Sequence, residues 1–197
     1  MLEEKWASIE DFAALFQYFW YRDFPMDAKM AVGAGRVDWT IHIGVVVRNV
    51  GDLLGLVTRF ERGGRKDAIL RSTDGDEIAV EWEWGDVLGE RANELQKLKD
   101  HSVRPKSKER LKYVVLITYT HTSDIEKVYN RVMGKWEGAQ WPLLLILIKV
   151  EKSKLRMRTE FKKIQMSVFY KGERRELRSA PAFPWEVPST RWSYELK

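Results

Sequence analysis

The chain has 197 residues, 44% of them hydrophobic and 32% charged, which is typical of a folded globular protein and excludes an intrinsically disordered one. It contains no cysteine, so disulfides and thiolate metal sites are excluded and a reducing compartment is permitted. The first residues, MLEEKWASIEDF, are too acidic for a signal peptide, and the longest apolar run, WPLLLILIKV, is far shorter than a bilayer span of about 20 residues. We therefore expect a cytoplasmic protein that does not bind a membrane.

The net charge of +5 is concentrated near the end of the chain. Residues 151–197 hold 12 Lys+Arg against 6 Asp+Glu, whereas residues 1–150 hold 22 against 23. A basic end on a nearly neutral body predicts a surface for polyanions, with nucleic acid first among them. A solvated strand face that carries spare lysines explains the same charge equally well.

The predicted elements begin with two helices. Ser8 has the position of an N-cap, with Asp11 three residues later, and the helix runs to about Tyr21. A second helix begins at Asp38, because the apolar residues from there to Val50 form a stripe at helical spacing. Its β-branched residues are typical of a strand. We favour a helix because no period of two reproduces the stripe.

Strands dominate the rest of the chain. Hydrophobic runs and turn residues predict a three-stranded meander over 53–61, 66–72 and 77–84. An alternation follows, with a helix over 88–101, a strand over 111–120, a helix from the capping box at Ser123 to about Trp136, and a strand over 142–150. Such an alternation predicts parallel pairing of the strands, and a hairpin is expected around residues 171–173.

The expected fold is α/β, with a mixed central sheet, helices on both faces and a C-terminal β-hairpin. We expect one domain, made of an N-terminal helix and loop (1–37), a core (38–150) and a basic hairpin with a Pro- and aromatic-rich tail (151–197). Trp82 and Trp84 are expected in the core, because they alternate with glutamates along the strand.

The acidic residues of the meander are the first candidates for a site. Thr73-Asp74-Gly75 fits a three-residue hairpin loop, and that register places Asp67 directly opposite Glu81. A two-residue Asp-Gly turn would instead place Asp67 opposite Trp82. Glu83, two residues further along, projects from the same face. Carboxylates that converge on a half-buried face repel one another, and a hard divalent cation bound between them would explain why they lie together. Mg²⁺ is the simplest candidate, because it needs only one or two carboxylates together with water and phosphate ligands. The competing explanation is that these acids pair with basic neighbours such as Arg65 and Lys66.

The segments RKDAIL (65–70) and EIAVEWE (77–83) resemble the PD-(D/E)XK nuclease superfamily, which has the restriction-endonuclease-like fold. The signature of that family is an aspartate on the second core strand and Glu-x-Lys on the third. The resemblance implies an αβββαβ core over residues 38 to about 121, with the helix and strand up to residue 150 as a peripheral extension. It also implies that Asp67 and Glu81 are metal ligands. Glu83 occupies the place of the usual lysine, as it does in some restriction endonucleases, and Asp38 is the candidate for an acid from the first core helix.

We therefore predict a nuclease that hydrolyses DNA with Mg²⁺ or Mn²⁺. Glu83 would orient the attacking water or hold a second metal, and Lys66 or Lys97 would stabilise the charge of the transition state. With three histidines and no Gly-x-Ser-x-Gly or His-Glu-x-x-His motif, a serine triad or a zinc protease site is disfavoured. The alternative is a non-catalytic nucleic-acid-binding or protein-interaction module on the same scaffold, and a homodimer is left open.

The basic tail supplies the candidate DNA-binding residues. Alternate residues of a strand share a face, so Arg156, Arg158 and Lys162 are expected to form a stripe that follows a phosphate backbone. Lys163 is included in the same candidate surface. A solvated edge strand protected by lysines is the competing interpretation.

Overall fold

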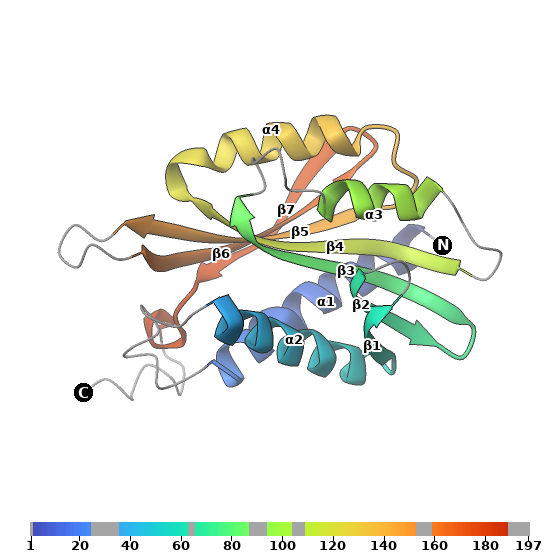
Figure 1. Cartoon of the computed structure of the whole chain (residues 1–197), viewed down its shortest axis with the longest axis horizontal. Helices are drawn as coiled ribbons and strands as arrows, with labels where there is room; N and C mark the ends of the chain where they lie inside the picture. Colours follow the sequence, from blue (N-terminus) through green and yellow to red (C-terminus); the bar gives the residue numbers. More distant parts are fainter. Residues whose placement is uncertain are drawn as a thin grey trace.

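In the part of the chain that the structure describes, seven strands form one mixed sheet and lie side by side in chain order (Figure 1). The computed structural model describes residues 2–24, 36–62, 66–86, 94–103, 109–152 and 159–188. The strands are β1 (Val57–Arg62), β2 (Lys66–Ser72), β3 (Gly75–Asp86), β4 (Glu109–His121), β5 (Leu143–Lys152), β6 (Thr159–Tyr170) and β7 (Glu173–Pro181). Strands β3, β4 and β5 run parallel, and the remaining neighbours pair antiparallel.

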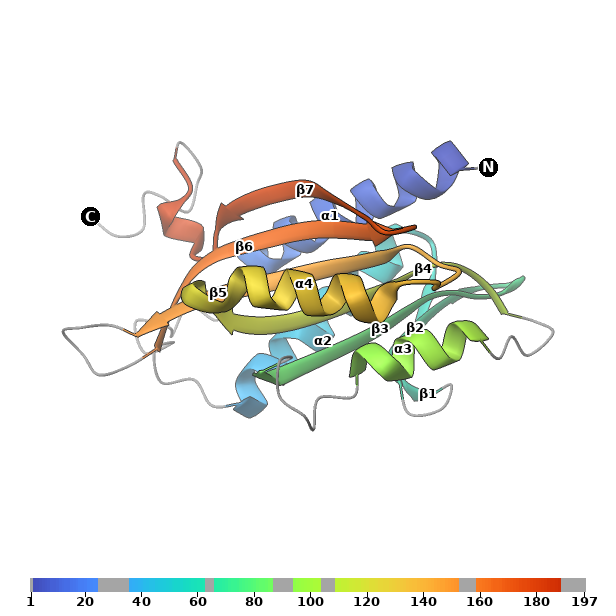
Figure 2. The same ribbon diagram turned by 90° about the horizontal axis from the view of Figure 1, so that it is seen from above.

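Helices cover both faces of this sheet. They are α1 (Leu2–Arg22), α2 (Arg36–Leu53), α3 (Glu94–Val103) and α4 (Ile125–Trp136), with short 3₁₀ turns η2 (Thr122–Asp124) and η3 (Pro184–Glu186). Figures 1 and 2 show α1 and α2 on one face and α3 and α4 on the other. Both α3 and α4 connect parallel strands, so their common face is the one expected for successive crossovers of the same hand.

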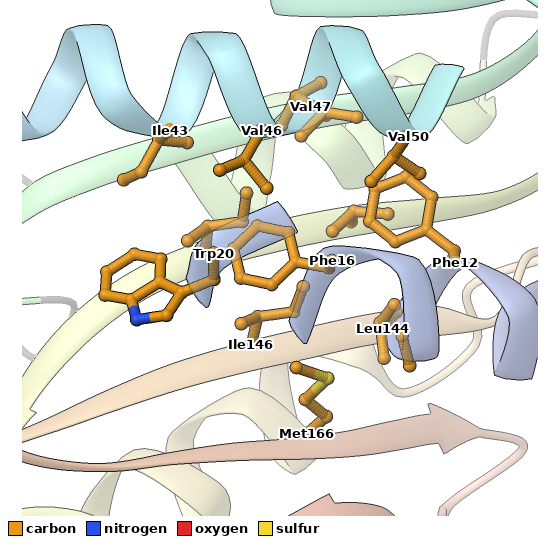
Figure 3. Close-up of a cluster of buried hydrophobic side chains, with 14 of the residues drawn as sticks. Phe12, Phe16, Trp20, Ile43, Val46, Val47, Val50, Leu144, Ile146 and Met166 are labelled. Carbon is orange, nitrogen blue, oxygen red and sulfur yellow. The ribbon is translucent and has the colours of Figure 1, made fainter. Parts of the chain in front are cut away.

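The central strands are apolar on both faces because both faces are covered. Along β5, residues 144, 146 and 148 pack toward α1 and α2, whereas residues 143, 145 and 147 pack toward α3 and α4. Figure 3 shows the first of these two clusters, in which side chains of α1 and α2 meet Leu144, Ile146 and Met166. The buried run of β5 therefore follows from its place inside the sheet.

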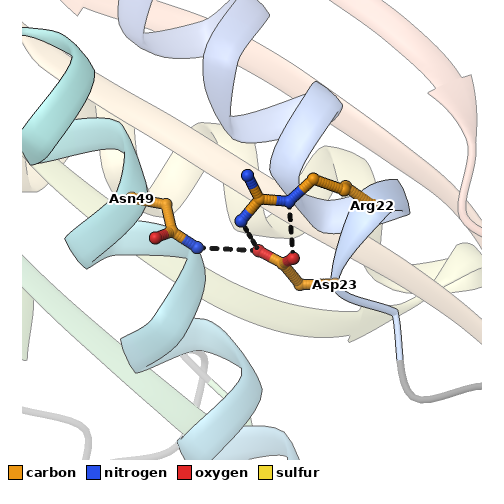
Figure 4. Close-up of polar contacts among 3 residues, drawn as sticks. All are labelled: Arg22, Asp23 and Asn49. Carbon is orange, nitrogen blue, oxygen red and sulfur yellow. Dashed lines mark hydrogen bonds and ion pairs between the residues drawn. The ribbon is translucent and has the colours of Figure 1, made fainter.

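The ends of α1 and α2 are joined by polar contacts around Asp23 (Figure 4). The Arg22 guanidinium donates to both Asp23 oxygens, at 2.7 and 2.8 Å, and the Asn49 side-chain amide of α2 donates to one of them at 2.8 Å. The Trp20 indole N–H also donates to the Ala182 carbonyl, at 2.8 Å, and so ties α1 to the segment after β7. These contacts hold α1 to α2 and to the segment after β7.

The α/β class, the mixed sheet, the helices on both faces and the C-terminal hairpin are confirmed. The parallel pairing of the three central strands is confirmed as well. Strand β5 is not peripheral, because it lies between β4 and β6 and hydrogen-bonds to both. Trp82 packs partly buried against the α1/α2 cluster, as expected. Trp84 belongs to β3, but its side chain lies outside the described residues.

Both predicted capping boxes were wrong. Helix α1 begins at Leu2, so Ser8 lies inside it, and the Ser8 carbonyl accepts a hydrogen bond from the Tyr113 hydroxyl at 3.1 Å. Residues around Ser123 form the 3₁₀ turn η2, and α4 begins only at Ile125, without a side-chain cap from Asp124. Tertiary contacts decide these boundaries, which local capping signals describe poorly.

Helix α2 ends in close contact with the sheet. Gly55 has φ +70°, and the Leu56 and Gly55 amides donate to the Gly51 and Asp52 carbonyls, which is a Schellman motif. A Cβ on Gly51 would overlap the Thr58 hydroxyl of β1 and press on Leu70 of β2 at 3.3 Å. The absence of a side chain at Gly51 therefore lets α2 approach the sheet.

We predict that Gly51→Ala destabilises the protein by about 1–3 kcal/mol, because the added methyl group forces α2 away from β1. Gly44→Ala is the matched control in the same helix, since its Cβ would meet Phe60 at an ordinary 3.9 Å. The control should stabilise the protein by up to about 1 kcal/mol through helix propensity. Denaturant unfolding of both variants measures the difference, and equal stabilities would contradict the close approach.

His42 is buried in an aromatic box between α1 and α2. The side chain is 5% exposed, and its ring centroid lies 4.7 Å from that of Trp20, 5.6 Å from that of Trp39 and 5.8 Å from that of Phe24. Burial lowers the pKa of His42 to about 4, although the Asp23 charge and backbone carbonyl oppose the shift. The imidazole is therefore neutral at pH 7.

We predict a loss of stability in mild acid that depends on His42. Its pKa is about 4 in the folded state against 6.5 when free, so the unfolded chain binds the proton more strongly and stability falls as pH drops through this window. A shift of this size is worth about 3 kcal/mol. His42→Leu should therefore show a shallower decline between pH 6.5 and 4 than the wild type in urea unfolding. Parallel declines of the two proteins would rule out this role of His42.

Candidate functional site

The hairpin between β2 and β3 has the predicted register but a different turn. Ser72 pairs with Gly75. The loop is therefore the two residues Thr73 and Asp74, and the predicted three-residue loop was wrong. A bulge at Glu77 adds one residue to β3 and compensates for the shorter loop. Beyond the bulge the ladder pairs Leu70 with Ile78, Ile69 with Ala79, and Ala68 with Val80.

The same register brings two acidic side chains together. Asp67 follows the parity of Ile69, and Glu81 that of Ala79, so both face the α3/α4 side of the sheet. Their carboxyl groups lie close enough for Glu81 to influence the pKa of Asp67. Asp67 Oδ2 also accepts a hydrogen bond from the Trp82 backbone N–H at 2.7 Å. The Asp67 side chain is thus held against β3.

Helix α3 adds two charged side chains to this pair. The Lys97 ammonium lies 3.2 Å from Glu94 Oε1 and 4.0 Å from Glu81 Oε2. Lys97 was a sequence candidate and Glu94 was not. A residue at the start of a crossover helix has no local signal that places it over a particular strand. We call Asp67, Glu81, Glu94 and Lys97 the acidic site.

Burial and charge act against each other in the acidic site. Glu81 is 0% exposed, and burial raises the pKa of the neighbouring Asp67 carboxyl. The Trp82 N–H, the Glu81 carboxyl and the Lys97 charge oppose that rise. Partial burial lowers the pKa of Lys97, but its bond to Glu94 and the charges of Glu81 and Asp67 outweigh this effect and raise it. The three carboxyl groups of the acidic site therefore stabilise a positive charge among them, which here is the Lys97 ammonium.

The other sequence candidates lie at different distances from this site. Glu83 is half-buried on the same strand face as Glu81 and is paired with Thr118 of β4. Lys66 begins β2, directly before Asp67. Asp38 lies exposed on α2, which covers the opposite face of the sheet, so the structure does not bring it to the acidic site. Among the described residues, no group of three or more His, Asp and Glu side chains is arranged to hold a metal.

The basic candidates of the tail are only partly described. Arg156 and Arg158 lie outside the described residues. Lys162 and Lys163 are exposed on β6, and Lys162 forms an ion pair with Glu160 at 3.2 Å. A bulge at Lys162 interrupts the alternation of faces, so a stripe of strictly alternate residues does not continue through it.

Comparison with known proteins does not assign this site. No protein-family model and no curated protein matches the chain. No helix in the described ranges is long and apolar enough to cross a membrane. The chemistry of the acidic site must therefore be inferred from its geometry.

We predict that Asp67→Asn stabilises the protein by up to about 1 kcal/mol in chelator at neutral pH, because it removes a charged form that burial disfavours, as the raised pKa of Asp67 indicates. Asparagine can still accept the Trp82 N–H through its side-chain oxygen. Asp76→Asn, which removes an aspartate paired with Arg71 at 3.5 Å, is the control and should be neutral or slightly destabilising. Thermal unfolding measures both. A clear loss of stability in Asp67→Asn would indicate that this carboxylate is structural.

Proposed function

We propose that the protein is a divalent-metal-dependent nuclease that hydrolyses phosphodiester bonds of DNA at the acidic site. The observation that carries the proposal is the meeting of the Asp67 and Glu81 carboxyl groups under α3, beside the Lys97 ammonium. Carboxylates that are buried together at a cost in stability are typical of functional sites.

The donor set of the site fits Mg²⁺ or Mn²⁺. Two carboxylates with adjoining water are sufficient for Mg²⁺, which seldom occupies a cage made of protein ligands alone. Asp67 and Glu81 would hold the metal, and Glu83 lies on the same face for a further contact. A bound divalent cation would supply positive charge to the phosphate and lower the pKa of a coordinated water.

The residues of the chain would supply the remaining chemistry. The Glu83 carboxylate would orient the attacking water and accept its proton. The Lys97 ammonium would donate hydrogen bonds to the phosphate oxygens as negative charge develops on them. Lys97 comes from α3 and not from β3, so it would take the role of the lysine that the Glu-x-Lys pattern lacks here.

The order of the elements supports the same proposal. Helix α2, the meander β1–β3, helix α3 and strand β4 follow the αβββαβ order of the restriction-endonuclease-like fold that the sequence resembles. The two acids lie on the second and third strands of this unit, as in the family signature.

A second candidate is a non-catalytic nucleic-acid-binding module. It is favoured by the position of Lys97, whose ammonium already neutralises part of the charge of Glu81 and Glu94. In this case the acidic site would be a structural ion-pair network. The two candidates differ in whether a divalent cation binds and in whether DNA is cleaved.

We predict that Asp67→Asn and Glu81→Gln each lower Mg²⁺-dependent cleavage of plasmid and linear DNA by at least about a hundredfold, because each removes a metal ligand. Glu77→Gln is the matched control on β3 and should cleave DNA normally. The Glu77 carboxylate lies outside the acidic site and forms an ion pair with Lys112 at 2.7 Å. Gel assays with Mg²⁺, Mn²⁺ or chelator measure cleavage. Glu83→Gln, titrated with Mg²⁺, tests whether that residue contributes.

Thermal unfolding with and without Mn²⁺ separates loss of metal binding from loss of folding. Wild-type protein should gain stability with Mn²⁺, and Asp67→Asn should gain none. Full cleavage by both site variants would exclude the nuclease mechanism. A wild-type protein that neither cleaves DNA nor responds to Mn²⁺ would favour the non-catalytic candidate.

A further inference from the structure

Two lysines face each other on the same side of the sheet as the acidic site. Lys149 of β5 pairs directly with Lys163 of β6, two residues beyond the pair formed by Leu147 and Gln165, so both point to the α3/α4 side. Within the described residues neither lysine forms an ion pair. Burial lowers the pKa of the half-buried Lys149, and the Lys163 charge lowers it further. Like charges directly opposite in a sheet are destabilising.

The acidic side chains near Lys149 and Lys163 do not neutralise the charge of these two lysines. Glu176 of β7 is already engaged, because Arg174 lies 3.9 Å from its carboxylate and the Gln165 side-chain amide donates to it. Glu126 lies exposed on the first turn of α4. Glu176 and Glu126 raise the pKa of Lys149, whereas Arg174 lowers it, and the balance remains a lowered pKa. Burial and the facing Lys163 charge, together with Arg174, therefore outweigh the effect of the two acids on Lys149.

The lysine pair lies across the sheet from the acids. Glu83 is level with Thr118 of β4, and Thr118 is level with Leu147, two residues before Lys149. Two strand spacings separate both Glu83 and Glu81 from Lys149, with two residues of rise for Glu83 and four for Glu81. The backbones are therefore roughly 12 Å and 16 Å apart. The intervening Thr118 is fully buried on this face, and its hydroxyl has no hydrogen-bond partner. Polar groups thus continue from the acids to the lysines at the carboxyl ends of the parallel strands.

We propose that Lys149 and Lys163 form a phosphate-binding subsite that holds the backbone of a DNA strand a few nucleotides from the phosphate at Asp67 and Glu81. The inference deepens the proposed nuclease function and depends on it. A phosphodiester supplies the anion that two facing ammonium groups lack. The rise of about 3.4 Å per nucleotide in a duplex strand lets a short stretch of one strand span the separation. The bound DNA strand would then run across β3, β4, β5 and β6.

The test measures DNA binding in chelator, where no cleavage occurs. The double variant Lys149→Gln/Lys163→Gln should bind a labelled duplex of about 20 base pairs roughly tenfold more weakly at about 0.1 M salt, and its plot of log affinity against log salt should be flatter by about one unit. The same variant should have an unchanged or higher melting temperature, because the repulsion between the lysines is gone. This second measurement shows that the variant is folded.

Lys112→Gln is the matched control, because Lys112 lies on the same face at the amino end of β4 and pairs with Glu77. It should leave the salt slope unchanged. Lys149→Arg/Lys163→Arg keeps both charges and should retain binding. A double glutamine variant with the slope of Lys112→Gln, or a wild-type protein that binds no DNA in chelator, would overturn the subsite.

Failure of the subsite and failure of the nuclease function give different results. If Asp67→Asn abolishes cleavage but the double glutamine variant binds normally, the nuclease proposal stands and the subsite is wrong. If wild-type protein does not cleave DNA but the glutamine variant binds more weakly, the phosphate contact stands and the nuclease proposal is wrong.

Discussion

Coverage of the central strands from both sides is the constraint on which the rest of this structure depends. Strands β4 and β5 lie between two helical layers, so their interior positions must be apolar on both faces. Toward the carboxyl ends of the parallel strands, the α3/α4 face carries polar and charged side chains among the apolar ones. The acidic site and the lysine pair both lie in this zone, on opposite sides of the buried Thr118.

In the acidic site, the attraction between Lys97 and Glu81 is smaller than the free-energy cost of burying the carboxylates. Two unit charges 4 Å apart attract by about 4 kcal/mol at the effective dielectric of a protein near its surface. Lys97 lies 4.0 Å from Glu81 and its side chain is 37% exposed, so screening by water reduces that attraction. Removal of a carboxylate from water costs several kcal/mol per ion. One partly exposed ammonium therefore offsets only part of the cost of burying Glu81 and Asp67, and a stronger cation would offset more.

Much of the fold could be predicted from hydrophobic pattern. The runs at 111–120 and 142–150 are long and apolar, and both form parallel central strands. The opposition of Asp67 and Glu81 was predicted for a partly wrong reason, since a two-residue loop and a bulge at Glu77 together give the shift that a three-residue loop would give alone. The position of Glu94 and the pairing of Lys149 with Lys163 depend on how α3 docks and on the register between β5 and β6. No local pattern encodes either.

The contacts of Lys97 have a consequence for how the proposed divalent cation would enter the acidic site. Its ammonium contacts Glu81 on the sheet and Glu94 on its own helix, one turn away. A divalent cation that displaced Lys97 from Glu81 would leave its contact with Glu94 in place, so the ammonium would keep a counter-charge. Lys97 would thus compete with the proposed cation for Glu81 while keeping a second partner. Such an exchange at Glu81 would not require α3 to leave the sheet, because its buried Leu95 and Leu98 would continue to hold it there.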